Sequence, residues 1–156
     1  MAAPAMSYLI CSMGLVVLIL VLPGFFAMER NYAAENMAMR ELTEICDYTS
    51  NTLENLFLLA NSTNQKELNV TKEMLYLPMT IEGSFYTMRI VSAADNATAS
   101  RVTAFLNDKD WVEGSSWLVP GLKVLNGDPL AINGTSLVAG CTRSASGFYV
   151  WIEEGD

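Results

Sequence analysis

The side chains that could do chemistry begin with a short acidic run, Asp108, Asp110 and Glu113. Asp108 and Asp110 are spaced like the first ligands of a calcium-binding loop, but the glycine and the final glutamate of such a loop are missing. We therefore expect a solvated loop without a metal ion. A carboxylate pair for glycoside hydrolysis is compatible with this spacing, although nothing in the sequence marks a cleft. Histidine is absent, which excludes Ser-His-Asp catalysis, Cys-His catalysis and histidine zinc sites. The sequence thus predicts no catalytic, metal-binding or cofactor-binding residue, and a protein that is not an enzyme.

The three cysteines lie in different surroundings. Cys11 belongs to a charge-free apolar segment, Cys46 to the apolar side of a predicted helix, and Cys141 to a predicted strand. Cys11 is expected to be an inert apolar residue. A domain on the outside of a cell can form disulfides. We predict a Cys46–Cys141 disulfide, which would close a loop of about 95 residues. Two buried free thiols are the alternative.

Four Asn-x-Ser/Thr sequons are present, and all of them lie after the first 60 residues. Three of the four fall in predicted turns or loops. Sequons of this kind indicate N-glycosylation at the surface of a secreted domain. The predicted glycosylation sites are Asn61, Asn69, Asn96 and Asn133.

Charge is distributed unevenly along the chain. The 156 residues include 9 Lys or Arg and 17 Asp or Glu, for a net charge of −8, and none of them lies among the first 28 residues. An acidic chain without a basic stripe does not neutralise phosphates, so nucleic acid is excluded as a partner. Residues 5–28 carry no charge, and a helix needs about 20 residues to cross a bilayer. We expect this segment to lie in a membrane or in equally apolar protein surroundings.

A secretory signal peptide is an alternative for the apolar segment. Such a peptide begins with basic residues and ends at a cleavage site made of small residues, and neither feature is evident here. Removal of a short basic leader would explain the missing basic flank. The first charges after the segment are Glu29 and Arg30, and the rest of the chain is acidic. The positive-inside rule therefore places the downstream domain outside the cell.

Residues 29–60 contain no Gly or Pro and are rich in helix-forming residues. Apolar residues recur there at spacings of three or four, which predicts one buried helix face. This face comprises Leu42, Cys46, Thr49, Leu53, Leu56 and Ala60, widened by Ile45 and Phe57; Glu35, Glu41, Glu44 and Glu54 lie off it.

Joined to the apolar segment, this stretch predicts one helix of about 55 residues and about 80 Å. Its first half would extend beyond a small domain and would need a bilayer or copies of itself. Pro23-Gly24 indicates either a tolerated kink or helix end, or a functional bend in a filament core.

The remainder of the chain changes from helical to strand periodicity. Turn residues such as Glu82-Gly83, Ser146-Gly147 and Asn126-Gly127-Asp128 separate short stretches rich in β-branched and aromatic residues. We predict one antiparallel sheet, packed on the helix, with strands at residues 74–77, 85–91, 101–106, 122–125, 135–142 and 148–152. The aromatic residues are expected in the core and in cross-strand pairs, with an exposed subunit contact as the alternative: Phe85, Phe105, Trp111, Trp117, Phe148 and Trp151.

This pattern resembles a type IV pilin. The charge-free N-terminal helix, the proline at position 23, the amphipathic helical extension and the small antiparallel sheet carry the resemblance, most strongly over residues 1–60. The sequons and the absence of a basic leader look most like the archaeal branch, which includes archaellins and adhesive pilins. In that family a peptidase removes a basic leader, and the apolar helices bundle into the core of a filament.

The predicted fold class is therefore α+β. It has an apolar filament-core or transmembrane helix at residues 1–28, an amphipathic extension at 29–60 and an antiparallel β head domain at 61–156. The resemblance implies a self-assembling extracellular filament subunit whose precursor is held in the membrane, with surface ligands or other cells as targets of adhesion. The runner-up is a membrane-anchored surface protein or an archaellum stator-type subunit that does not polymerise. The expected filament-core residues are Leu15, Val16, Val17, Leu18, Ile19, Leu20, Val21, Leu22, Pro23, Phe25 and Phe26.

Overall fold

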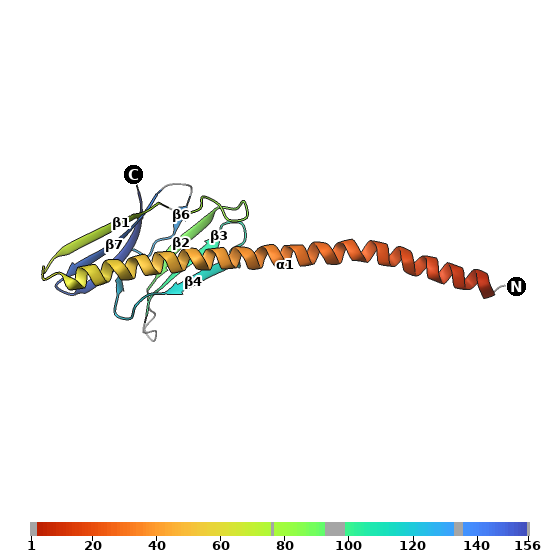
Figure 1. Cartoon of the computed structure of the whole chain (residues 1–156), viewed down its shortest axis with the longest axis horizontal. Helices are drawn as coiled ribbons and strands as arrows, with labels where there is room; N and C mark the ends of the chain where they lie inside the picture. The colour runs from red at the N-terminus through yellow and green to blue at the C-terminus, as the bar shows by residue number, and fades with distance from the viewer. Residues whose placement is uncertain (1–2, 76, 93–98, 133–135, 156) are drawn as a thin grey trace. The chain divides into compact units, whose positions relative to one another are not determined.

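The computed structural model describes residues 3–75, 77–92, 99–132 and 136–155 (Figure 1). It has one long N-terminal helix followed by a small β domain, so the predicted α+β class is confirmed. The elements in chain order are α1 (Ala3–Ser62), β1 (Leu68–Met74), β2 (Tyr86–Val91), β3 (Arg101–Leu106), β4 (Glu113–Trp117), β5 (Lys123–Val124), β6 (Leu130–Ile132), β7 (Leu137–Ser144) and β8 (Gly147–Glu154). The chain divides into two compact units, Met1–Met37 and Ala38–Asp156.

The first unit is helical throughout its described part. Helix α1 continues through Pro23 and Gly24 without a break, so the alternative in which the helix ends at this point is wrong. Pro23 has no N–H to donate to the carbonyl of Ile19, four residues earlier, so one hydrogen bond of the helix is missing there. The helix is therefore weakened at Pro23 but not terminated.

The second unit contains two four-stranded sheets rather than the single sheet that the sequence predicted. One has the order β1-β7-β8-β5 and the other the order β4-β3-β2-β6. All described pairings between strands are antiparallel except that of β5 with β8, which is parallel. Alternation along a strand reveals which side chains share a surface, but it does not identify the neighbouring strand. The division into two sheets was therefore not evident from periodicity.

The core of the second unit lies where residues 38–60 of α1 pack on the inner faces of both sheets. The predicted helix face is confirmed: Leu42, Cys46, Thr49, Leu53, Leu56, Ala60 and Ile45 are all buried, and Phe57 is half-buried. The sheets contribute Tyr86, Met88, Ile90, Val102, Ala104, Leu106, Leu137, Ala139, Val150 and Ile152. Phe57 meets Phe148 of β8 edge to face, with 4.9 Å between ring centroids.

Strand β4 makes the closest approach to the helix. A Cβ atom at Gly114 would lie 2.8 Å from Leu42 Cβ and 2.5 Å from the Leu42 carbonyl carbon. Two side chains of α1 also bond to the main chain of β4. Cys46 Sγ donates to the Gly114 carbonyl at 3.4 Å, and Ser50 Oγ donates to the Trp117 carbonyl at 2.8 Å. Gly114 is therefore required for the helix and strand to lie this close together.

The C-terminal end of α1 is held by β7. Arg143 Nη1 donates to the Thr63 carbonyl at 2.7 Å and to the Ala60 carbonyl at 3.4 Å. The last turn of α1 has no basic residue of its own. A positive charge from β7 thus reaches the negative end of the helix dipole and two carbonyls near its end.

Several local predictions are confirmed and several strands were missed. Strand β3 begins and ends where the sequence indicated, and Glu82-Gly83 forms the predicted tight turn with positive φ at both residues, 49° and 81°. The turn between β7 and β8 includes Ser146, as predicted, and the Asp128 amide bonds to Asn126 Oδ1 at 3.1 Å in the third predicted turn. Strands β1, β4 and β6 lie almost or entirely outside the predicted strands.

Candidate assembly surfaces

The first candidate surface is the apolar part of α1 in the first unit. Every described side chain from Tyr8 to Ala33 is exposed, and the expected filament-core residues are all among them. The stretch qualifies by length and composition as a membrane-crossing helix, and its most apolar window has no buried residue. A helix that is apolar on all sides is stable only in lipid or among other apolar helices. The segment is therefore suited to a membrane or to a bundle of helices.

The second candidate surface is the outer face of the sheet β4-β3-β2-β6. Side chains alternate between the two faces along these strands, so the neighbours of the inward Tyr86, Met88 and Ile90 point away from α1. Two of the outward residues, Thr87 on β2 and Thr103 on β3, are nevertheless buried. The register places the outward residues of β2, β3 and β4 opposite one another. We call this surface the aromatic face; its defining residues are Phe85, Arg89, Arg101, Phe105, Trp111, Glu113 and Trp117.

The prediction that the aromatic side chains lie in the core is wrong for three of the six. Trp117 is 65% exposed, Trp111 61% and Phe85 52%. The register places Trp117 on the side of the sheet that faces away from α1, and Phe85 and Trp111 each precede a buried residue, Tyr86 and Val112, just before β2 and β4. Phe105, Phe148 and Trp151 are half-buried. On the aromatic face, the Arg89 guanidinium lies 5.6 Å from the centre of the Phe105 ring, in cation–π geometry.

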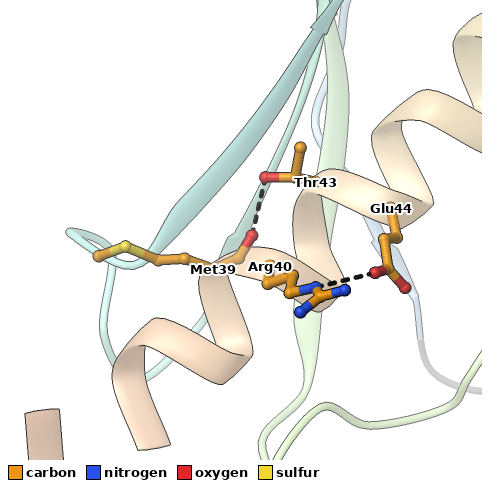
Figure 2. Close-up of polar contacts among 4 residues, drawn as sticks. All are labelled: Met39, Arg40, Thr43 and Glu44. Atoms are coloured by element: carbon orange, nitrogen blue, oxygen red, sulfur yellow. Dashed lines mark hydrogen bonds and ion pairs between the residues drawn. The ribbon is translucent and has the colours of Figure 1, made fainter. Parts of the chain in front are cut away.

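The third candidate surface is a groove along the flank of α1 in the second unit. It has a volume of about 440 Å³ and is lined by Glu41, Glu44, Ile45, Tyr48, Leu77 and Pro78; we call it the acidic groove. Figure 2 shows the adjoining turns of α1, where Arg40 Nε contacts Glu44 Oε1 at 3.2 Å and Thr43 Oγ1 donates to the Met39 carbonyl at 2.8 Å. Both partners of the ion pair are well exposed, so it contributes little to stability.

The predicted disulfide between Cys46 and Cys141 is wrong, because all three cysteines are free thiols. Cys46 lies against Gly114, in one sheet, whereas Cys141 lies in β7, in the other sheet. Arg143, two residues beyond Cys141, bonds to Ala60, which is 14 residues after Cys46 along α1. Fourteen residues of helix span about 21 Å, so Arg143 of β7, close to Cys141 in sequence, contacts α1 well away from Cys46.

Burial keeps both inner thiols protonated. It raises the pKa of Cys46 to about 12, against the opposing effect of a hydrogen bond from the backbone at Ala104, and the charge of Asp47 raises it further. Burial also raises the pKa of Cys141. Since the thiolate is the reactive form of cysteine, Cys46 and Cys141 are structural residues rather than nucleophiles.

Two of the four predicted glycosylation sites can be placed. Asn61 is exposed near the end of α1, and Asn69 is exposed on β1. Asn69 Oδ1 accepts a hydrogen bond from Thr142 Oγ1 at 3.1 Å, and Thr142 Oγ1 in turn accepts one from Trp151 Nε1 at 3.3 Å. This pair of bonds holds the Asn69 amide by its oxygen. Asn96 and Asn133 lie outside the described residues.

The acidic run at residues 108–113 lies on the surface. Asp108, Asp110 and Glu113 are all exposed, and Asp108 Oδ2 accepts a hydrogen bond from Ser84 Oγ at 2.9 Å. Within the described ranges, no group of three or more His, Cys, Asp or Glu residues is arranged to hold a metal ion.

Sequence reasoning missed the aromatic face as a unit. One signal was available: Phe85, Thr87 and Arg89 alternate with Tyr86, Met88 and Ile90, and only the second set is entirely apolar. The part played by β4 was hidden, because the sequence EGSSW has no β-branched residue and was not predicted as a strand. The acidic groove could not be found, since it joins helix residues to residues 77–78 across about 30 positions of sequence.

Comparisons with known proteins identify no relative: no protein family, no curated protein and no solved structure matches the chain.

Proposed function

We propose that this chain is a structural subunit of an extracellular filament of the type IV pilus kind. It polymerises through its apolar N-terminal helix, it is held in the membrane before assembly, and the filament serves adhesion or surface attachment. The observation that carries the proposal is the exposure of apolar side chains on all sides of α1 over residues 8–28. The resemblance of residues 1–60 to pilins supports the same conclusion.

The exposed apolar helix provides a large driving force for association. The eight aliphatic residues 15–22 are each between 42% and 73% exposed. Burying an entire side chain of this size contributes about 1.5–3 kcal/mol, so burying the exposed half of eight of them contributes on the order of 10 kcal/mol per copy. Packing against other copies of α1 supplies this burial in a polymer, as lipid does before assembly.

The aromatic face favours a polymer over a lone membrane anchor. Large exposed apolar side chains that gather on one surface mark interaction sites, and three aromatic side chains of this face are more than half exposed. An additional protein contact in the second unit is the expected use of such a surface. A single-pass surface protein or a stator-type subunit is the second candidate, because α1 also has the length and composition of a membrane span.

A charge in the predicted core tests the proposal. Val17→Asp places a carboxylate in the middle of the apolar segment, and an unpaired buried charge costs at least several kcal/mol. The variant is expected to form almost no filaments in electron micrographs of the purified full-length protein, whereas the matched variant Val17→Leu forms them as the wild type does. Filaments of Val17→Asp at wild-type number would contradict the assignment of this helix to the filament core.

A further inference from the structure

The aromatic face combines exposed rings with basic charge. Trp117 lies opposite the half-buried Arg101 across β4 and β3, and the exposed Arg89 lies over the ring of Phe105. The acidic residues Asp108, Asp110 and Glu113 are exposed near Phe85 and Trp111, so the basic part of the face is the part that carries Arg89 and Arg101. Tyr, Trp, Phe and Arg are the residue types enriched in the centres of protein interfaces. In a chain with a net charge of −8, this surface is suited to an acidic and partly apolar partner.

The acidic groove of the same unit has the complementary chemistry. Its lining includes the acidic residues Glu41 and Glu44, together with Tyr48 and the apolar residues Ile45, Leu77 and Pro78. Glu41 makes no ion pair with any described residue. Both side chains of the Arg40–Glu44 ion pair are exposed, so Glu44 can leave Arg40 and pair with another cation at little cost in free energy. Two carboxylates beside apolar walls thus match two arginines beside aromatic rings.

The two surfaces lie on different sides of the second unit. The aromatic face points away from α1, whereas α1 forms one wall of the acidic groove. A contact that joins two different surfaces of identical copies is heterologous, and it produces either a ring or an open helical polymer. A symmetric dimer would instead use one surface on both copies.

We propose that the aromatic face of one copy docks on the acidic groove of the next copy, with Arg89 and Arg101 meeting Glu41 and Glu44. This contact deepens the proposed filament function and rests on it: the apolar helices form the core, and this second contact orders the β domains around them. The occupant is a second copy of this chain because the chain itself carries the complementary surface.

Cross-linking of the full-length protein tests the contact whether or not filaments form. In a Cys11→Ser background, Ser115→Cys places a thiol on the exposed outer side of β4, and Met79→Cys places one next to Pro78 at the edge of the groove, where both carboxylates are kept. The two proteins are mixed and treated with a flexible bis-maleimide. Buried Cys46 and Cys141 do not react while the protein is folded, and tryptophan fluorescence checks that each variant is folded.

Docking predicts cross-linked dimers in the mixture and none in either protein alone. It also predicts a ladder of higher oligomers when both cysteines are on one chain. The matched control pairs Ser115→Cys with Lys66→Cys, an exposed site outside both surfaces, and is expected to give no product. Adding Arg89→Glu and Arg101→Glu to the Ser115→Cys protein should lower the yield at least about tenfold. Adding Glu44→Arg to the protein that carries the groove cysteine should restore part of the lost cross-linking yield.

Three other results would overturn the proposed contact. Filaments without the mixed cross-link would retain the proposed function and refute this docking. Cross-linked dimers of the Ser115→Cys protein alone would indicate symmetric face-to-face pairing. Binding of a soluble polysaccharide to the aromatic face, lost with Trp117→Ala while no cross-link forms, would assign the face to carbohydrate. The mixed cross-link in a protein that forms no filaments would support the contact and refute the filament.

Discussion

Replacing Gly114 with alanine tests the packing of β4 on α1, on which the second unit depends. A Cβ at this position would lie against the Thr43 amide nitrogen and 2.5 Å from the Leu42 carbonyl carbon. Contacts between such atoms are normally about 3.5–4 Å, so the strand or the helix must move by about 1 Å. The atoms in the way belong mainly to the helix main chain, which cannot turn aside as a flexible side chain can.

The expected cost follows from the contacts that this movement disturbs. Overpacking of a tight site costs about 1–3 kcal/mol. The bonds from Cys46 Sγ to Gly114 and from Ser50 Oγ to Trp117 would each lose up to about 1 kcal/mol. Gly→Ala also restricts the unfolded chain, which offsets about 0.4–1 kcal/mol. We expect Gly114→Ala to lower the free energy of unfolding by about 2–3 kcal/mol, and the Tm by about 8–12 °C.

Tryptophan fluorescence measures this change specifically in the second unit. All three tryptophans, Trp111, Trp117 and Trp151, lie after residue 38, so denaturation of the full-length protein in detergent micelles reports that unit and not the apolar helix. Ser115→Ala is the matched control, because the Ser115 side chain points outward next to Gly114; its effect should stay within about 0.5 kcal/mol. A Gly114→Ala protein as stable as the control would refute the close approach of helix and strand.

Three further predictions concern the core, its thiols and the surface of the second unit. Leu53→Ala, at a buried position of α1, should lower the free energy of unfolding by about 2–5 kcal/mol. Leu58→Ala, at an exposed position of the same helix, should change it by less than about 0.5 kcal/mol. Equal effects of the two variants in denaturation would contradict the assigned inner face of α1. The free energy of unfolding should fall as the pH rises from about 9 toward 12. In the unfolded chain a thiol loses its proton near pH 9, whereas in the folded protein Cys46 keeps its proton because its pKa is raised to about 12. Burial also raises the pKa of Tyr86, which acts in the same direction. Cys46→Ala should reduce that fall, and an unchanged slope in pH-dependent denaturation would show that Cys46 is not buried as described. Glycopeptide mass spectrometry of protein from its native source should find sugar at Asn61 and Asn69, and both sites unmodified would remove this support for an extracellular location.

The helical half of the fold could be predicted from sequence because its signals are local. Period-3.6 spacing identified the inner face from Leu42 to Ala60, and every residue placed on it is buried or half-buried. Strand β3 was predicted with its observed bounds, since Arg101–Leu106 is β-rich and is flanked by polar residues. The length of α1 followed from the lack of any strong terminating signal other than Pro23, which a helix tolerates at the loss of one hydrogen bond.

The remaining features depend on contacts between distant segments. The residues of β4 do not themselves favour a strand. The strand forms because it pairs with β3 and because Gly114, which has no side chain, lets α1 pack closely against it. Trp111 and Trp117 are exposed because α1 covers the other side of that sheet. The residue types alone do not predict which side the helix covers. The disulfide was predicted from two inward-facing cysteines in a domain expected outside the cell, but Cys46 lies against one sheet and Cys141 lies within the other.

Negative-stain electron microscopy of the full-length protein after detergent removal tests the central claim most directly. If the apolar helix of α1 packs among copies of itself, the protein assembles into uniform filaments with a helical repeat. If the chain is instead a lone membrane anchor, detergent removal in the presence of lipid gives protein embedded in vesicles, and without lipid it gives irregular aggregates. Vesicle-embedded protein without any filaments would contradict the account.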